Sequence, residues 1–410
     1  MTSLSVSVIV VRRRRPKLLQ LCLKAMSQLR YDKFELVVVA DRAGLAAVKA
    51  SELAELTKTV LFEEPNVATA RNLGIAQASG ELVAFIDDDA VPEPGWLHHL
   101  AAVFADQEIA AAGGYVRGHN GISYQYLGQI VDAFGASTPL RHSGDAPIVI
   151  EGRPEQALKT IGTNSAFRRD VLVKMGGFNP AFAYYLDETE LNIRLAKAGF
   201  KTAIVPLAQV HHRRAASEHR APSGMPRSLF QIGASVAALL RIHAPDTDHA
   251  LPIFRAQAVQ RNRLLGFMVS GACEPNDIKR LLKTYEAGVA AGLSRPISPP
   301  AKITRSGTQF VNIWQSGVRR RHKVVSGFRL HQKTLRQKAR TELLSGSVVS
   351  LYIFSRTALF HKVRFHPDGF WEQSGGLFGR AIRSESIFKA MTLAKRVEKE
   401  DNRVAAARHP

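Results

Sequence analysis

The chain has 410 residues, 45% of them hydrophobic, and a formal net charge of +21 at pH 7. This composition can bury a full core and excludes a disordered chain, and two cysteines exclude a disulfide framework. No apolar run approaches the roughly 20 residues of a bilayer span, and the apolar segment 4–11 precedes its arginines, unlike a secretory signal. We therefore expect a cytoplasmic protein with an anionic partner or surface.

Residues 4 to about 118 alternate short β-branched runs with amphipathic stretches, which is typical of βαβ units on a parallel sheet. Pro16 fits the first turn of a helix that reaches Leu29. Asn66 fits the N-cap of a helix that ends near Ala78, before Gly80. The predicted strands are 4–11, 34–40, 58–62 and 82–86. The sequence thus predicts an α/β domain with helices flanking a mostly parallel sheet.

Three consecutive carboxylates, Asp87, Asp88 and Asp89, close the apolar run 81–86. Carboxylates that end a buried strand repel one another and resist dehydration unless a cation lies between them. Ligands of open α/β sheets bind at the carboxyl ends of the strands. We therefore expect a divalent metal that holds a phosphorylated ligand at this edge.

The segment 119–159 is rich in Gly, Ser and Pro and is predicted to be a variable insertion over this site. A second informative stretch begins at Ile161. It contains an acidic helix start at Asp187 and Glu188, where the helix dipole favours negative charge, and ends on a short strand before His211 and His212. The pattern of this helix is also explained by packing against a core, without any functional role for its acidic residues.

The remaining half predicts amphipathic helices at 228–241, 256–270 and 277–291, the last capped by Asn276 or Asp277. The segment 348–354 is predicted to be a strand. The stretch 360–371 mixes cations with aromatic residues, which suits a membrane interface, sugar stacking or the rim of a core. Residues 395–410 are predicted to form a solvent-exposed helix with a frayed end.

Basic residues concentrate between positions 301 and 340, where eleven Lys or Arg occur without any Asp or Glu. Such a run is often a solvated face. The alternatives are contact with anionic lipid headgroups, a phosphorylated acceptor or nucleic acid.

Taken in order, these motifs resemble those of glycosyltransferase family 2, whose catalytic domain has the GT-A fold. The resemblance rests on segments 6–16, 34–41, 66–75, 87–89, 162–168, 176–178, 187–191 and 211–212. It implies a Rossmann-like α/β domain with a mixed, mostly parallel sheet over residues 1–215. A basic, mainly helical extension would follow, divided into 216–300 and 301–410.

The resemblance also assigns a metal site. Asp87 and Asp89 are similar to the family's DXD carboxylates, with Asp89 on the metal and Asp87 nearer the ribose or a metal-bound water. His212 is expected to be the further metal ligand, with His211 as the alternative. Mn²⁺ or Mg²⁺ suits such an oxygen-rich site.

For transfer to a hydroxyl, the resemblance implies a base opposite the leaving group, and we expect Glu188 in this role. Asp187 is the alternative, because the family's Glu-Asp pair is reversed here. Use of such a base implies inversion at the anomeric carbon.

The same resemblance places donor contacts at Asp41 for the base or ribose and at Arg71 for the uracil or phosphate side. Asp88 and Arg15 complete the expected donor set, and Ala40 stands where the family usually has another Asp. Residues 12–14 replace the family's Thr-aromatic-Asn with arginines. The four arginines 12–15 are expected either to hold a diphosphate or to be solvated, or to signal an altered donor.

We therefore predict a metal-dependent, inverting glycosyltransferase that moves a sugar from a nucleotide sugar, most simply a UDP-sugar, to a glycan or lipid-linked acceptor in cell-envelope or exopolysaccharide synthesis. Peripheral contact with the anionic inner face of the plasma membrane is a further expectation, and nucleic acid is not an expected partner. The alternative is a non-catalytic nucleotide-sugar or glycan-binding protein with a degenerate donor site. Nucleotidylyl transfer is disfavoured because the N-terminal segment lacks a Gly-rich phosphate loop.

Overall fold

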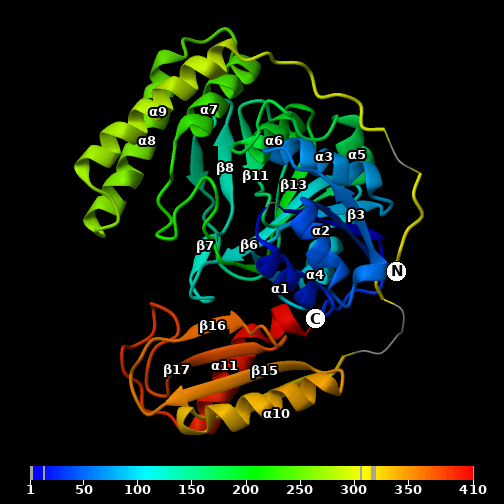
Figure 1. Cartoon of the computed structure of the whole chain (residues 1–410), viewed down its shortest axis with the longest axis vertical. Coiled ribbons are helices and arrows are strands. Elements are labelled where there is room, and N and C mark those ends of the chain that lie inside the picture. The colour runs from blue at the N-terminus through cyan, green and yellow to red at the C-terminus, as the bar shows by residue number, and fades with distance from the viewer. Residues whose placement is uncertain (1–2, 13, 305–306, 315–319, 410) are drawn as a thin grey trace.

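A mixed sheet forms the centre of the N-terminal half of the protein in the computed structural model (Figure 1), which describes residues 3–12, 14–304, 307–314 and 320–409. Its main path runs β3-β2-β1-β4-β12-β6-β13-β10. These strands are β1 (Val6–Arg12), β2 (Phe34–Ala40), β3 (Thr57–Leu61), β4 (Leu82–Asp87), β6 (Ile109–Arg117), β10 (Ile148–Ile150), β12 (Ser165–Arg168) and β13 (Lys201–His212). Strands β1 to β4 are mutually parallel, and β12 is antiparallel to both β4 and β6. The predicted α/β fold with a mostly parallel sheet is confirmed.

Helices cover both faces of this sheet. They are α1 (Pro16–Met26), α2 (Arg42–Lys49), α3 (Val67–Gln77), α4 (Trp96–Ala102), α5 (Arg169–Lys174) and α6 (Asp187–Lys197), with short 3₁₀ turns η1 (Ala54–Leu56) and η2 (Val103–Ala105). Successive residues of β1 enter opposite cores: Val8 packs with α1, whereas Ile9 packs with α3. This explains the continuous apolar runs, because a strand covered on both faces needs no polar side.

Local capping follows the sequence prediction. Pro16 is the first residue of α1, and the side chain of Asn66 accepts a hydrogen bond from Thr69 N at the start of α3. Helix α1 ends at Met26, three residues before the predicted end. Gly80 follows α3 where a Cβ would lie 2.6 Å from Ser7 N, so only glycine fits against β1.

The insertion 119–159 forms short strands. Within it, β7 (Tyr124–Tyr126) pairs with β6 and β10 pairs with β13, while β8 (Gln129–Asp132), β9 (Ser137–Pro139) and β11 (Gln156–Lys159) form a separate antiparallel sheet. The short strand β5 (Ala90–Pro92), which precedes the insertion, also pairs with β13. Val131 and Ala157 of this small sheet share a core cluster with Leu186 and Ile193. The insertion therefore supports the side of α6.

Three helices follow the first 215 residues: α7 (Phe230–His243), α8 (Ala250–Val269) and α9 (Pro275–Ser294). They confirm the predicted helices, with shifted ends. The cap of α9 is Glu274, whose side chain forms a capping box with Asp277; the predicted caps were two or three residues too late. Helices α7 and α9 pack closely, because Cβ atoms on Gly233 and Gly288 would lie 2.2 and 2.0 Å from backbone oxygens of the facing helix.

Residues 320–409 contain a second sheet, shown in orange below the first unit in Figure 1. Its order is β14-β15-β17-β16, with β14 (His322–Phe328), β15 (Val348–Ser355), β16 (Lys362–Phe365) and β17 (Trp371–Gly376). The 3₁₀ turn η3 (Arg329–His331) leads into α10 (Gln332–Leu344), which shares a core with β15 on one face, while α11 (Leu393–Arg408) covers the other. The extension after residue 215 is thus mainly helical but also carries a sheet.

Several expectations for this unit are settled by burial. The predicted strand at 348–354 is confirmed by β15. Phe365 and Trp371 of the basic and aromatic stretch are core residues. The prediction of a solvent-exposed helix at 395–410 is wrong for the described residues, because Arg396, Glu400 and Arg408 of α11 are almost fully buried in ion pairs.

The segment 307–314 lies in sequence between the helices α7–α9 and the second sheet. It packs on the N-terminal sheet domain, where Ile313 N donates to Phe34 O at 2.8 Å. Residues 305, 306 and 315–319 of the predicted basic run lie outside the described residues. The predicted domain boundaries at residues 215 and 300 stay a prediction.

The end of α11 is fastened to the first unit by a buried ion pair. Arg408 donates to both carboxylate oxygens of Glu93, at 2.7 and 3.1 Å, and His211 Nε2 lies 2.8 Å from Glu93 Oε1. Gly95 N also donates to Ala407 O at 3.0 Å. Burial opposes the charged form of Glu93, but Arg408 and His211 hold its pKa well below the ordinary value.

We expect Arg408→Met to destabilise the protein strongly, because it leaves Glu93 charged, buried and without its main partner. The expected loss in the free energy of unfolding is about 3–5 kcal/mol. Because the pKa of Glu93 is depressed in the folded state, its contribution is present at neutral pH and is lost as the pH falls below about 4.3. The difference from wild type in urea unfolding should therefore shrink in acid.

The matched control is Arg383→Met, which removes an exposed arginine from the same unit. It should leave the free energy of unfolding within the range of ordinary surface changes, about 0.5 kcal/mol. Equal stability of the two variants would contradict the assigned role of the Glu93 pair.

Candidate active site

A cleft of about 520 Å³ opens at the carboxyl ends of β1 and β4. It is also bordered by the N-termini of α3 and α6 and by the segment after β13. Of the predicted site residues, the cleft brings together Arg15, Arg71, Asp87, Asp88, Asp89, Asp187, Glu188 and His212. The sheet edge that the sequence singled out is therefore the place where these side chains meet.

Asp41 does not line the cleft with these residues. Asp41 caps α2 by accepting from Gly44 N at 2.8 Å, and it also accepts from Arg14 N at 2.7 Å. No described residue of 119–159 lines the cleft, although the charge of Glu188 acts on Tyr126 and Lys159 of the insertion. The insertion shares a core with α6, and its predicted position over the site stays a prediction.

Asp87, Asp89 and His212 form a group of potential metal ligands, with one ligand atom from each within 4.8 Å of the others. His212 Nε2 lies 3.2 Å from Asp89 Oδ1 and 4.0 Å from Asp87 Oδ2. The antiparallel pairing of β13 with β5 places His212 opposite Ala90, directly after the carboxylates. Two carboxylates and an imidazole are a donor set that fits a divalent cation.

Burial and charge prepare this group for a cation. Asp89 and His212 are buried, whereas Asp87 keeps a third of its side chain exposed to the cleft. Burial opposes the charge on Asp89, but His212, Arg15 and the Ala215 N–H keep its pKa well below the usual range. His212 Nδ1 is buried without a hydrogen-bond partner among the described residues. His211 points elsewhere, to Glu93, and is not in this group.

Arg15 is held by the carboxylates themselves. It donates to Asp89 Oδ2 at 2.9 Å and contacts Asp88 Oδ1. This pairing fixes the aspartate loop, so binding of a diphosphate by Arg15 stays a prediction. The side chain of Arg12 and the whole of Arg13 lie outside the described residues, and Arg14 is exposed and lies 3.5 Å from Glu218.

Arg71 connects the two groups of acids. It is almost fully buried, contacts Asp187 Oδ2 and lies 3.9 Å from Asp87 Oδ1. Gly162 makes room for it, because a Cβ there would lie 1.7 Å from the guanidinium. Thr163 Oγ1 donates to Asp87 Oδ2 at 2.5 Å. The roles of Gly162 and Thr163 were not predicted, although their segment was part of the resemblance.

Glu188 and Asp187 begin α6 after Leu186, whose φ is 67°. Glu188 Oε1 accepts a hydrogen bond from Gly162 N at 2.9 Å. Burial opposes the charge on Glu188, but Arg71 and the Gly162 N–H lower its pKa to about 2. Both carboxyl groups line the cleft, but Asp187 is buried and engaged by Arg71, whereas Glu188 is half-buried. Burial and the charge of Glu188 raise the pKa of Asp187 well above its ordinary value, against the effect of Arg71. Exposure favours Glu188 as the base and the pKa favours Asp187, so the assignment to Glu188 stays a prediction.

The family comparison decides the class of this unit. The sequence model described as glycosyl transferase family 2 matches residues 7–176. The chain carries a family 2 glycosyltransferase domain. The match takes in β1 to α5 and includes the three aspartates of the cleft. Asp187, Glu188 and His212 lie beyond its end, and the fold brings them to the same cleft.

Relatives of this glycosyltransferase domain agree with that class. The chain is 29% identical over 226 residues to the O-antigen biosynthesis protein RfbC of Myxococcus xanthus, and 29% identical over 222 residues to the probable glycosyltransferase YdaM of Bacillus subtilis. These matches cover 52% and 50% of the chain but only 17% and 49% of the two relatives. The chain therefore spans less than half the length of either relative.

A solved structure is similar at a lower level. It is the mannosyltransferase PcManGT from Pyrobaculum calidifontis in complex with GDP-Man and Mn²⁺, at 18% identity and a TM-score of 0.46, covering 72% of this chain and 88% of that one. Similarity at this level does not assign a donor to the glycosyltransferase domain.

Proposed function

We propose that the protein is a metal-dependent, inverting glycosyltransferase that moves a sugar from a nucleotide sugar to a hydroxyl of a glycan or lipid-linked acceptor. The observation that carries the proposal is one cleft that is lined by Asp87, Asp89 and His212 and also by Glu188. Displacement at an anomeric carbon needs both a group that stabilises the leaving group and a base for the attacking hydroxyl.

In this proposal Asp87, Asp89 and His212 hold Mn²⁺ or Mg²⁺, which when bound neutralises charge on the nucleoside diphosphate leaving group. Glu188 accepts the proton of the acceptor hydroxyl as that oxygen attacks the anomeric carbon. Arg71 orients Asp187 and faces Asp87, and Arg15 keeps Asp88 and Asp89 in place. Attack from the face opposite the leaving group inverts the anomeric carbon.

We further infer a UDP-sugar donor and an acceptor of the cell envelope or an exopolysaccharide. Support comes from the resemblance to family 2 and from a relative that is named for O-antigen biosynthesis. Asp41 caps α2 at the end of β2, so its proposed contact with the nucleotide base or ribose would come from beside the cleft.

Cytoplasmic location with peripheral contact at an anionic membrane remains part of the proposal. None of the helices in the described part of the chain combines the length and apolarity of a bilayer span. The net charge of +21 supports contact with an anionic surface. Part of the basic run is neutralised internally, because Arg336 and Arg340 of α10 pair with Glu372 and Asp368.

The test is thermal unfolding of the purified full chain with a panel of nucleotide sugars, with Mn²⁺ or with a chelator. A true donor at 100 times its Kd should stabilise the folded state by about 2.7 kcal/mol, and only when the metal is present. The same donor should be hydrolysed or transferred. A metal-dependent shift without any turnover would favour a non-catalytic binding protein, and no shift would argue for a lost donor site.

A further inference from the structure

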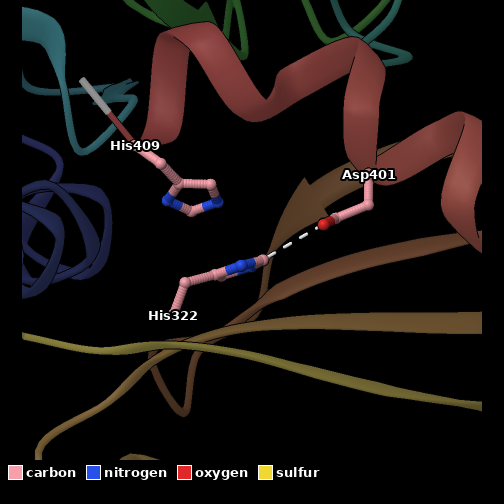
Figure 2. Close-up of side chains that lie close together, drawn as sticks. All are labelled: His322, Asp401 and His409. Carbon is pink, nitrogen blue, oxygen red and sulfur yellow. Dashed lines mark ion pairs between the residues drawn. The ribbon is translucent and has the colours of Figure 1, made fainter.

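Three potential metal ligands also meet outside the cleft, between β14 and α11. His322 begins β14, Asp401 lies on α11, and His409 follows that helix, with all three side chains converging in Figure 2. One ligand atom from each lies within 4.8 Å of the others. We propose that His322, Asp401 and His409 bind a zinc ion, at a site separate from the donor cleft.

The distances suit a metal that draws its ligands slightly together. His322 Nε2 is 3.7 Å from Asp401 Oδ1 and 3.0 Å from Ser350 Oγ. The imidazole rings of His322 and His409 lie against each other at a tilt of 34°, with centroids 3.8 Å apart. Zinc bonds of about 2.0–2.2 Å in a tetrahedron hold ligand atoms roughly 3.3–3.6 Å apart. His322 and Asp401 are already near this spacing, whereas the ring of His409 has to turn away from that of His322, and His322 Nε2 has to leave Ser350 Oγ, for one ion to bind all three residues.

Unsatisfied polar atoms point to a missing ligand. Both ring nitrogens of His409 are buried and lack a hydrogen-bond partner among the described residues. A buried polar group left in this way costs about 1–3 kcal/mol. Asp401 is oriented by Tyr352, whose hydroxyl donates to Asp401 Oδ1 at 2.9 Å. Such an outer hydrogen bond is typical of carboxylates that ligate metals.

The chemistry of the group selects the metal. Two imidazoles and one carboxylate suit zinc, whereas the two carboxylates and one imidazole of the cleft are better suited to Mn²⁺ or Mg²⁺. His322 and His409 also border a cavity of about 670 Å³ whose other lining residues are Arg30, Arg320, Arg321 and Lys323. These cations repel any divalent ion, and they disfavour most strongly Mg²⁺ and Ca²⁺, which are held mainly by charge. A metal held by strong bonds to nitrogen is favoured, with water or an anion from the cavity as its fourth ligand.

A metal here would brace the second unit beside its joint with the first. His409 directly follows Arg408, which holds Glu93 of the first unit, and His322 starts the edge strand of the second sheet. One ion would thus fix the end of α11 to β14 beside the buried ion pair. We expect a structural role for this site, because it lies outside the residues that line the cleft.

The test uses the untagged full chain, stripped of metal and then titrated with Zn²⁺ in competition with a chromophoric chelator. Wild type and Asp89→Asn should each retain one tight zinc per chain at this site. His322→Ala and His409→Ala should each weaken that binding by at least about 10- to 100-fold, since even loss of an outer-shell partner has this effect. His331→Ala, which removes an exposed histidine of the same unit, should bind zinc like wild type.

Cobalt provides a second readout that does not depend on affinity. Co²⁺ should give visible absorption of a tetrahedral site in wild type and Asp89→Asn, and this absorption should be absent in His322→Ala, with circular dichroism confirming that the variant is folded. Zinc binding that is unchanged in both histidine variants, or that disappears in Asp89→Asn, would overturn the proposal. The Mn²⁺-dependent donor shift should survive in His322→Ala, so the proposed function and this site can fail separately.

Discussion

Asp89→Asn is expected to lower sugar transfer by roughly 10²–10³-fold, the size of effect that follows loss of one stabilising group for developing charge. Asp89 lies 3.2 Å from His212 Nε2 and belongs to the cation group of the cleft. An asparagine oxygen can still accept from Arg15 and from Ala215 N, and Arg15 keeps Asp88 as its partner. The substitution therefore removes a charged ligand while it preserves the loop.

Two measurements separate this effect from unfolding. The Mn²⁺-dependent stabilisation by the nucleotide sugar should disappear, whereas the unfolding temperature without metal should change little. Asp145→Asn, at an exposed position of the insertion, is the matched control and should transfer at the wild-type rate. Full activity of Asp89→Asn would remove Asp89 from the proposed metal site.

The sequence could predict the sheet because its signals are local. The β-branched runs of β1, β2 and β4, the Asn66 cap and Pro16 each act within a few residues, and the aspartates mark the end of β4. The position of these aspartates at a sheet edge then follows from parallel topology. For these reasons the amino-acid sequence alone could predict which edge of the sheet carries the cleft.

Pairings across long sequence distances could not be predicted in this way. The pairing of Arg15 with Asp88 and Asp89 was not among the alternatives that the sequence suggested for residues 12–15. Arg71 pairs with Asp187, 116 residues away. Neither pairing leaves a periodic signal. The charges of α11 were interpreted as solvent-exposed for the same reason, because charge in a helix does not show whether a partner such as Glu93 will cover it.

Glu188→Gln is the second substitution for which we expect a large effect, a loss of about 10²–10⁴-fold in transfer, which is the usual contribution of a general base. Glutamine matches glutamate in size, and its carbonyl oxygen can keep the hydrogen bond from Gly162 N that Glu188 Oε1 now accepts. The substitution removes the carboxylate that could accept a proton, and it leaves the proposed metal ligands Asp87, Asp89 and His212 unchanged. Donor affinity and its dependence on Mn²⁺ should therefore stay within a few-fold of wild type.

The comparison with Asp187→Asn makes this prediction specific to one carboxylate. Asp187 is buried and engaged by Arg71, so its loss should lower both stability and donor binding as Arg71 loses its partner. Glu188→Gln should instead lower kcat with little change in donor binding, and the exposed control Glu155→Gln should behave as wild type. If Glu188→Gln kept full activity, the base would have to be another group. Asp187, beside Glu188 at the start of α6, would then be the first candidate, because a residue that activates the acceptor hydroxyl must adjoin the same cleft.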